Sequence, residues 1–306
     1  MNLEQLKSRY LSGALEKGEY IKQMCALHAH LFEYPSLIAD ADIESIEIRR
    51  DSVIVTSRDC GVRLILDIHD TGSPGIGLLN FGAYERGEAG MFFRLIQGSG
   101  DVLDIGANLG WYSLNIAKRF PQKRVHAFEP VPTTFAKFEA NIRLNGLNNI
   151  SPYNVALSDK SGAVIVYLPS RSGAASMQDL SGEQSVQEVR CMTDRLDDFV
   201  ESKGIAIGYI KCDVEGAELL VFDGGLKAIA RDQPIILTEM LRKWSARFGY
   251  HPNNIIELLR GLGYSCFVLH GDGLRKIQSV NEETIETNYF FLHEDKHTQQ
   301  ISILSR

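Results

Sequence analysis

The fold is decided by residues 101–110, Asp101-Val102-Leu103-Asp104-Ile105-Gly106-Ala107-Asn108-Leu109-Gly110. This is a short apolar strand that enters a glycine-containing turn, and residues 111–119 follow with helical spacing. Open α/β sheets bind ligands at such carboxyl strand ends. Gly106 and Gly110 let the backbone approach a ligand closely, and Asn108 tolerates a positive φ. The stretch therefore predicts a ligand site at the start of a helix, where backbone N–H groups are free.

The next expected strand, residues 124–130, ends on the acid Glu129, 25 positions beyond Asp104. A carboxylate there can accept both hydroxyl groups of an adenosine ribose and would repel the 2′-phosphate of NADP. Asp104 beside the turn disfavours a pyrophosphate and favours the cationic sulfonium and amino groups of S-adenosylmethionine (SAM). Alternatively, Asp104 only caps backbone N–H groups. SAM is the expected ligand, and NAD is the alternative.

Four segments in order resemble the FkbM family of SAM-dependent methyltransferases: 103–110, 126–130, 154–159 and 210–218. The resemblance covers roughly residues 84 to 292, and Cys212 stands where the family often has an aliphatic residue. It implies an α/β, Rossmann-like class I methyltransferase fold with a seven-stranded, mostly parallel sheet flanked by helices, whose last strand is reversed. It also implies SAM as the cofactor.

Composition restricts the class of protein. The 306 residues are 44% hydrophobic and 23% charged, with a formal net charge of −7. This acidic balance argues against nucleic acid as a partner. The five cysteines are widely spaced and fit reduced thiols better than disulfides or a zinc site. Without a recognisable secretory signal or membrane-length apolar stretch, we expect a cytoplasmic protein with no membrane partner.

The chain divides into a region of residues 1–83 and a methyltransferase domain of residues 84–306. The first region predicts helix up to about residue 35, a small antiparallel β meander (43–48, 52–56 and 63–68) and a loop at 71–77. Its role is to pack on the domain, to cover the cleft, or to join two copies in a homodimer.

From residue 101 onward, strand and helix patterns alternate, which predicts a parallel sheet covered on both faces. Strands are expected near 101–105, 124–129, 151–156, 206–212, 234–239, 264–269 and 288–293, and helices near 109–119, 132–145, 195–202, 216–223 and 253–261. An insertion at 158–192 contains two expected paired strands, 163–168 and 187–192. Its segment 171–176 either lies over the cleft or is a solvated linker.

The catalytic candidates follow two apolar strands. Asp213 and Glu239 each end one, so neighbouring strands would bring both acids into one crevice, as ligands of a divalent cation such as Mg²⁺ or as base and orienting partner. Glu215 is close enough to join them; alternatively it favours a helix amino terminus, as we prefer for Glu218. Two further candidates are Lys211, as a partner of these acids or a holder of a substrate oxygen, and His251, as a base on a loop.

The expected cofactor site extends over several strand ends. Glu85, in a Tyr-Glu pair that the family often carries, meets the cofactor ammonium or is an exposed helix-start carboxylate. Asn154 and Ala156 are expected near the adenine. The expected cofactor-binding residues are Glu85, Asp104, Gly106, Ala107, Asn108, Gly110, Glu129, Pro130, Asn154, Ala156 and Asp213.

The expected function is methyl transfer from SAM to a hydroxyl of a small molecule, such as a sugar or natural-product scaffold. This reaction needs an in-line geometry and a carboxylate or metal ion that assists loss of the hydroxyl proton. The alternatives are N-methylation of an amine or amide side chain, including one on a peptide, an NAD-linked oxidoreductase, and a SAM-binding module without turnover. The acceptor itself cannot be read from the sequence.

Overall fold

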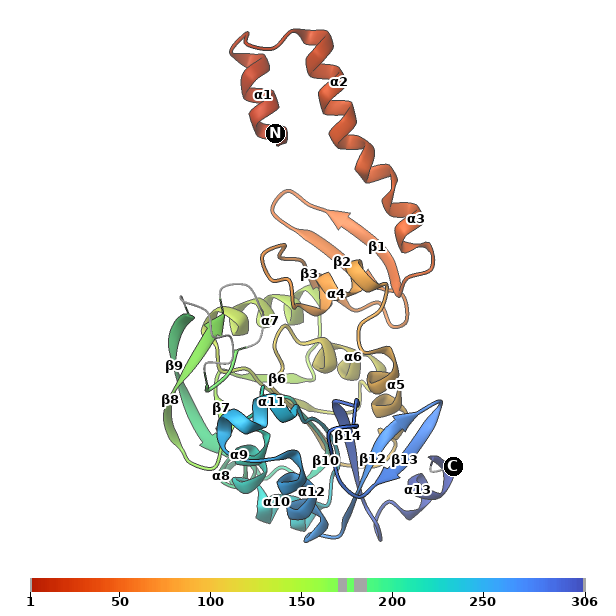
Figure 1. Cartoon of the computed structure of the whole chain (residues 1–306), viewed down its shortest axis with the longest axis vertical. Helices are drawn as coiled ribbons and strands as arrows, with labels where there is room; N and C mark the ends of the chain where they lie inside the picture. Colours follow the sequence, from red (N-terminus) through yellow and green to blue (C-terminus); the bar gives the residue numbers. More distant parts are fainter. Residues whose placement is uncertain (1, 170–174, 179–185, 305–306) are drawn as a thin grey trace.

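The computed structural model describes residues 2–169, 175–178 and 186–304, and its centre is an eight-stranded sheet (Figure 1). The strand order is β13-β12-β14-β11-β10-β4-β5-β6. In chain order the strands are β4 (Asp101–Ile105), β5 (Val125–Phe128), β6 (Ile150–Tyr153), β10 (Ile207–Cys212), β11 (Ile235–Glu239), β12 (Tyr264–His270), β13 (Gly273–Ile277) and β14 (Asn288–His293).

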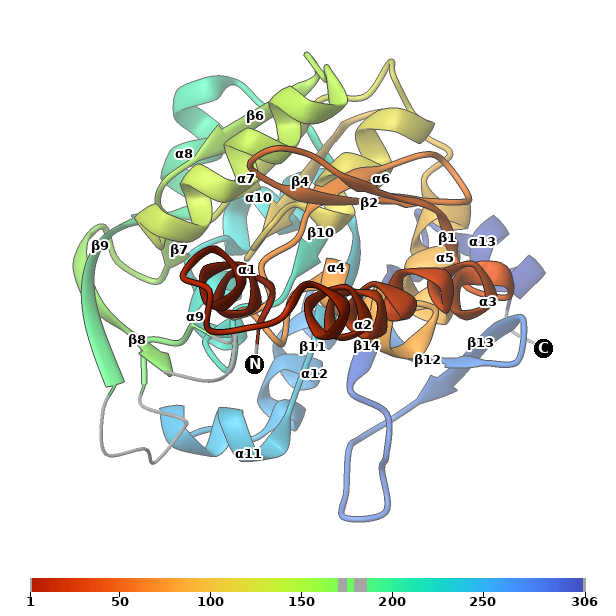
Figure 2. The same cartoon turned by 90° about the horizontal axis from the view of Figure 1, so that it is seen from above.

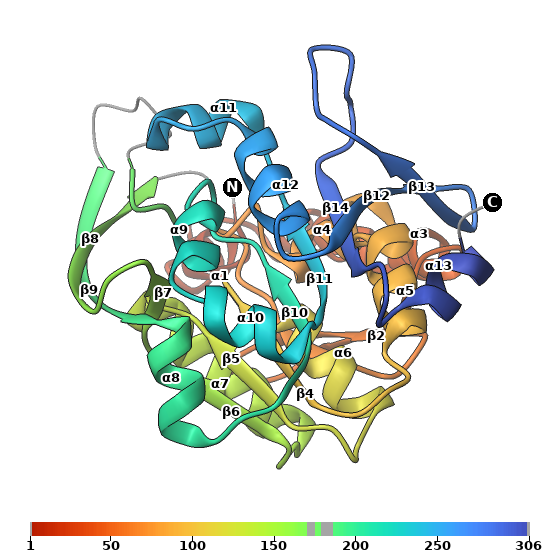
Figure 3. The same cartoon turned by 90° about the horizontal axis from the view of Figure 1, so that it is seen from below.

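Two hydrophobic cores cover the two faces of this sheet. The pleat turns Val102 of β4 into one core and its neighbour Leu103 into the other. The first core includes side chains of α5 (Arg86–Leu95), α6 (Trp111–Arg119) and α7 (Pro132–Asn145). Figure 3 shows the helices of the second: α8 (Leu196–Lys203), α9 (Glu218–Asp223), α10 (Leu226–Asp232) and α12 (Pro252–Arg260).

The expected sheet is confirmed. β6, β5, β4, β10 and β11 run parallel, whereas β14 is antiparallel to both β11 and β12. β13 adds an eighth strand, because it forms a hairpin with β12. In the described part of the methyltransferase domain, three helices were not expected: α10, α11 (Arg242–Ser245) and α13 (Thr298–Leu304). The short 3₁₀ helix η2 (Ala246–Phe248) continues α11.

Two predicted elements need correction. The expected strand at 151–156 is divided, because β6 ends at Tyr153 and β7 (Ala156–Ser158) belongs to another sheet. The expected loop at 71–77 is wrong in its second half, since α4 (Pro74–Phe81) begins there. Pro74 suits the first turn of that helix, and its neighbours Gly75 and Ile76 are buried.

The insertion forms a second, three-stranded sheet of β7, β9 (Val186–Arg195) and β8 (Gly162–Pro169). β8 and β9 are antiparallel, as expected for the paired strands, and β7 joins β9 in parallel. Val131, Val166 and Cys191 form its small core. Of the segment 171–176, residues 171–174 lie outside the described residues.

The first 81 residues form two parts. Figure 2 shows the β meander of β1 (Ile43–Ile48), β2 (Val53–Ser57) and β3 (Arg63–Ile65) on the side of the body that also carries α4. The meander contributes Val55 and Leu64 to the first core, so the two regions share hydrophobic packing across the predicted boundary at residue 83.

The second part is an N-terminal arm of α1 (Leu3–Leu11), α2 (Lys17–His28), η1 (Ala29–Phe32) and α3 (Tyr34–Ala39), which projects from the body (Figure 1). α2 has no buried side chain, and Leu6 is the buried residue of α1. Within the described part of the chain, no helix has both the length and the apolar character needed to cross a bilayer.

Candidate active site

The turn after β4 has the backbone that its residues predict. Gly106, Asn108 and Gly110 have φ values of 80°, 50° and 91°. A Cβ on Gly106 would overlap the carbonyl oxygen of Asp213, and one on Gly110 would overlap the ring of Phe138. Glycine is therefore required at both positions, and the expected positive φ of Asn108 is confirmed.

A cavity that is open to solvent lies beside this turn, at the carboxyl ends of β4, β5 and β10. Seven of its lining residues belong to the expected site: Gly106, Asn108, Glu129, Pro130, Ala156, Asp213 and Glu215. The insertion supplies Val166 of β8 and, between β8 and β9, Ala175 and Met177. The position of Ala175 agrees with the expectation that the segment 171–176 lies over the cleft, whereas Val166 and Met177 were not expected.

Glu129 is held firmly at one end of the cavity. Its Oε2 accepts the N–H of Asn108 at 3.0 Å, and its Oε1 accepts the N–H of Val131 at 2.9 Å. Burial raises the pKa of Glu129 to about 7, although both backbone hydrogen bonds act in the opposite direction. Each carboxylate oxygen has two lone pairs, so the oriented group can accept further hydrogen bonds from a ligand.

The structure does not place Asp104 at the cavity, which corrects the expectation that its charge faces the ligand. Asp104 is fully buried and does not line the cavity. Its Oδ2 accepts hydrogen bonds from the backbone N–H and the hydroxyl of Ser113, at 3.0 and 2.6 Å. It therefore caps the first turn of α6, in agreement with the alternative interpretation.

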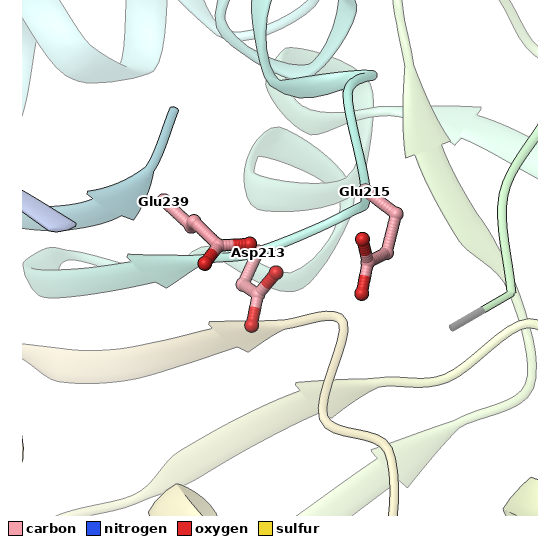
Figure 4. Close-up of side chains that lie close together, drawn as sticks. All are labelled: Asp213, Glu215 and Glu239. Carbon is pink, nitrogen blue, oxygen red and sulfur yellow. The ribbon is translucent and has the colours of Figure 1, made fainter. Parts of the chain in front are cut away.

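Three carboxylates converge beside the turn after β10, and we call Asp213, Glu215 and Glu239 the acid group (Figure 4). One oxygen from each lies within 4.8 Å of the others. β10 and β11 are paired neighbours, with Cys212 opposite Thr238, so the acids that end them meet as expected. Glu215, which lies in the turn after β10 and has a backbone φ of 53°, joins them.

The acid group is electrostatically strained. Burial is the main reason that the pKa of Glu215 is raised to about 8 and that of Glu239 to about 9, and the charge of Asp213 raises both further. Such a group can share a proton, attract a cationic ligand or hold a divalent cation. Asp213 and Glu215 line the cavity, so this chemistry is available to a bound molecule.

Lys211 pairs with the acids, which confirms one of its two expected roles. Its Nζ lies 3.3 Å from Oδ2 of Asp213, 3.9 Å from Oδ1 of Asp104 and 3.2 Å from the carbonyl oxygen of Gly106. The ammonium also lies 5.1 Å from the centre of the Tyr112 ring. Burial alone would lower the pKa of Lys211, but the neighbouring carboxylates outweigh it and raise the pKa.

Glu85 lies near the acid group, without lining the cavity. It is half-buried rather than exposed, and it accepts a 2.6 Å hydrogen bond from the hydroxyl of Tyr112. Burial, together with the charge of Asp213, raises the pKa of its carboxyl. No side-chain cap to α5 is formed. This position corresponds to neither an exposed helix-start carboxylate nor a cavity-lining residue.

The other expected site residues have structural roles. His251 is exposed and caps α12, because its Nδ1 accepts the N–H of Asn253, so it does not join the acid group. Asn154 donates to the carbonyls of Glu129 and Pro130 at 2.9 Å. Ala107 is buried with its N–H bonded to Phe128.

Glu218 is buried and accepts hydrogen bonds from the N–H groups of Val214 and Gly216. It therefore stabilises the turn after β10, which we call the acid turn, in agreement with the preferred role at a helix amino terminus. The sequence reasoning missed two residues that contact this turn from other parts of the chain. Tyr250 donates its hydroxyl to the carbonyl of Gly216, and Ser176 donates its hydroxyl to that of Glu215. A serine in a Ser- and Gly-rich insertion gives no signal of such a contact.

Comparisons with known proteins identify the family of this chain. The family model of the methyltransferase FkbM domain matches residues 104–266, more than half of the chain. The 2-O-methyltransferase NoeI of Sinorhizobium fredii is 31% identical over 153 aligned residues, and the match covers 45% of this chain and 62% of that protein. The 31-O-demethyl-FK506 methyltransferase FkbM of Streptomyces tacrolimicus is 31% identical over 156 residues, 41% of this chain and 59% of that protein.

Methyltransferase 1 of Beauveria bassiana is 27% identical over 142 residues, 40% of this chain and 57% of that protein. The matches therefore span less than two thirds of these curated relatives. The crystal structure of methyltransferase FkbM from Methylobacillus flagellatus KT aligns with a TM-score of 0.42 at 17% identity, covering 70% of this chain and 52% of that one. On the strength of the domain match, the chain belongs to the FkbM methyltransferase family.

Proposed function

We propose that the protein transfers a methyl group from SAM to a hydroxyl group of a small molecule. One observation carries the proposal: Glu129 and two members of the acid group, Asp213 and Glu215, line the same cavity. A fixed acceptor for ribose hydroxyls and a group of carboxyls that a bound cation would favour in the ionised form thus share one site. SAM has a ribose and a cationic amino acid end, and it supplies an electrophilic methyl group when bound.

The residues of the cavity fit this cofactor. Gly106 and Asn108 leave the backbone open to a ligand, and both line the cavity. Glu129 is oriented by two backbone N–H groups, which leaves its other lone pairs for the ribose hydroxyls. The acid group complements a sulfonium and an ammonium, whereas it would repel the diphosphate of NAD. This supports SAM over the NAD-linked alternative.

The acid group also supports a hydroxyl acceptor. An alcohol must lose its proton as it attacks, and a carboxyl group with a pKa close to neutral is well suited to accept it. The pKa of Glu215, raised to about 8, meets that condition. We assign proton acceptance to the acid group and its orientation to Lys211. The names of two relatives, a 2-O-methyltransferase and a 31-O-demethyl-FK506 methyltransferase, support the same acceptor class.

Two variations of the proposal use the same residues. The three carboxylates can instead hold a Mg²⁺ ion that lowers the pKa of the bound hydroxyl, because oxygen ligands of this kind suit that ion. They can also attract the ammonium form of an amine acceptor by charge and take up one of its protons before the transfer step, which supports N-methylation as the second candidate function. An amine with a free lone pair needs no carboxylate base in the transfer step.

The test combines binding with methyl transfer. Titration calorimetry should detect binding of S-adenosylhomocysteine, the demethylated product of SAM, and none of NAD. Methyl-labelled SAM is then incubated with panels of alcohols and amines, with and without EDTA, using wild type, D213N and E239Q. We expect label in alcohols and a loss of about a hundredfold or more in either variant. Binding of NAD in place of the SAM product would refute the proposal, and label confined to amines would replace it with N-methylation.

A further inference from the structure

The turn that carries the acid group is held by hydrogen bonds from three directions. Glu218 accepts the N–H groups of Val214 and Gly216, at 3.0 and 3.1 Å. Tyr250 donates to the carbonyl of Gly216 at 2.9 Å. Ser176 donates to the carbonyl of Glu215 at 2.8 Å. Glu218 is the first residue of α9, and Tyr250 lies just before α12. Ser176 belongs to the insertion, so its hydrogen bond joins the insertion to the turn.

Ser176 is itself fixed in position. Its side chain is 3% exposed, and its backbone forms a two-way bridge with Tyr167 of β8, with N···O distances of 2.7 and 3.2 Å. The neighbours on either side, Ala175 and Met177, line the cavity. A molecule in the cavity therefore touches residues directly before and after the one that holds Glu215.

Glu215 needs such support because its backbone is in the left-handed region, with a φ of 53°. A residue other than glycine is strained there and keeps this conformation only where its surroundings impose it. The following residue, Gly216, also has a positive φ, of 99°. Without a partner for its carbonyl group, the Glu215 peptide can rotate, and the carboxylate would leave the acid group.

We propose that Ser176 is a positioning residue that fixes Glu215 in the acid group. The inference rests on the proposed function for its effect on catalysis, but its structural part does not. It assigns the insertion a role beyond forming the part of the cavity wall that Ala175 and Met177 supply.

The experiment compares S176A and S176T with wild type, and uses S161A as a matched control. Ser161 lies beside the same insertion sheet and donates to Asp194 at 2.8 Å, far in sequence from the acid turn, so S161A removes a similar hydrogen bond elsewhere. The first readout is hydrogen–deuterium exchange of the peptide that covers residues 213–218, with and without S-adenosylhomocysteine. It needs no acceptor and no turnover.

For S176A we expect about tenfold faster exchange in this peptide, since loss of one hydrogen bond to the turn changes the local opening equilibrium by about that factor. S161A should match wild type, and S176T should stay within about threefold of it, because threonine keeps the hydroxyl. Equal exchange in S176A and wild type would overturn the proposal. So would equal acceleration in S161A, which would indicate only general loosening of the insertion.

The second readout is turnover with the alcohol found in the label-transfer screen. A positioning role predicts that kcat falls about tenfold in S176A while KM for SAM changes by less than about threefold, and that S176T restores kcat. A fall confined to KM, or no rescue by threonine, would contradict positioning of Glu215. If no alcohol is methylated by wild type but the exchange results hold, the proposed function fails and the structural role of Ser176 stands.

Discussion

Replacing Lys211 with methionine should destabilise the protein, because this lysine compensates two buried or half-buried carboxylates. Its side chain is 9% exposed and that of Asp104 is 1% exposed. At an effective dielectric constant of ~20, unit charges separated by 3.3 Å attract by about 5 kcal/mol and those separated by 3.9 Å by about 4 kcal/mol. Desolvation of the ammonium offsets much of this attraction, so the net contribution is smaller.

The cost of the substitution comes mainly from the acid that is left behind. Ser113 still donates two hydrogen bonds to Asp104, but the carboxylate has no counter-charge and must stay charged in the interior or take up a proton. Breaking one side of a buried pair usually costs about 3–5 kcal/mol. We expect a loss of about 3 kcal/mol in the free energy of unfolding for K211M, and recovery of about half of it in the double variant K211M/D104N.

Urea unfolding at pH 7, followed by circular dichroism, measures this difference, with K203M as the control because Lys203 is exposed. The folded-state pKa of Lys211 is raised above its ordinary value of 10.5. Its stabilising contribution is therefore complete below pH 10.5 and is lost only as the pH rises through the folded pKa. A K211M variant whose stability is within about 1 kcal/mol of K203M would refute this account, as would a double variant less stable than K211M.

Three further predictions concern separate parts of the molecule. E129Q should weaken S-adenosylhomocysteine binding in calorimetry by about tenfold or more, since the amide NH₂ would face a backbone N–H donor; unchanged affinity would remove Glu129 from the site. Burial lowers the pKa of His297 from 6.5 to about 4, and its Nδ1 accepts the N–H of His293, so this contribution is present above pH 6.5 and is lost as the pH falls toward 4. We expect wild type to lose about 2 kcal/mol more than H297N over that range in urea titrations, and parallel curves would contradict it. Deleting residues 2–33 should change the melting temperature by less than about 3 °C, because α2 buries no side chain and the buried Leu6 of α1 belongs to neither core of the body. Light scattering of both forms tests the expected homodimer through this arm.

The sheet could be predicted from the sequence because its determinants are local. β4, β5, β10 and β11 are short apolar runs followed by turn residues, and each is buried on both faces as a parallel strand must be. The same logic located the acid group, since acids that end neighbouring parallel strands meet at one edge. Even the positive φ of Asn108 followed from residue type.

Contacts between distant segments could not be predicted in this way. The segment 171–176 was expected either over the cleft or as a solvated linker, and the position of Ala175 agrees with the first alternative. Nothing in the insertion indicated that Met177 would line the cavity or that Ser176 would contact Glu215. His251 is a different case, because its role was readable: the residue before Pro252 at the start of a helical pattern is a helix cap, and its side chain is used for that purpose.

The position of Asp104 changes which residues distinguish SAM from a dinucleotide. Its carboxylate is occupied by Ser113 and Lys211 and does not face the cavity, so its charge is largely compensated before any ligand arrives. Lys211 contributes one positive charge, which Asp104 shares with Asp213. Glu215 and Glu239 are not paired with Lys211 in this arrangement, and the pKa of each is raised first by burial and then by repulsion from Asp213. A sulfonium and an ammonium would relieve that repulsion, whereas a diphosphate would increase it. The preference for SAM therefore depends on the acid group on β10 and β11, and D213N should lower the affinity for SAM more than D104N does.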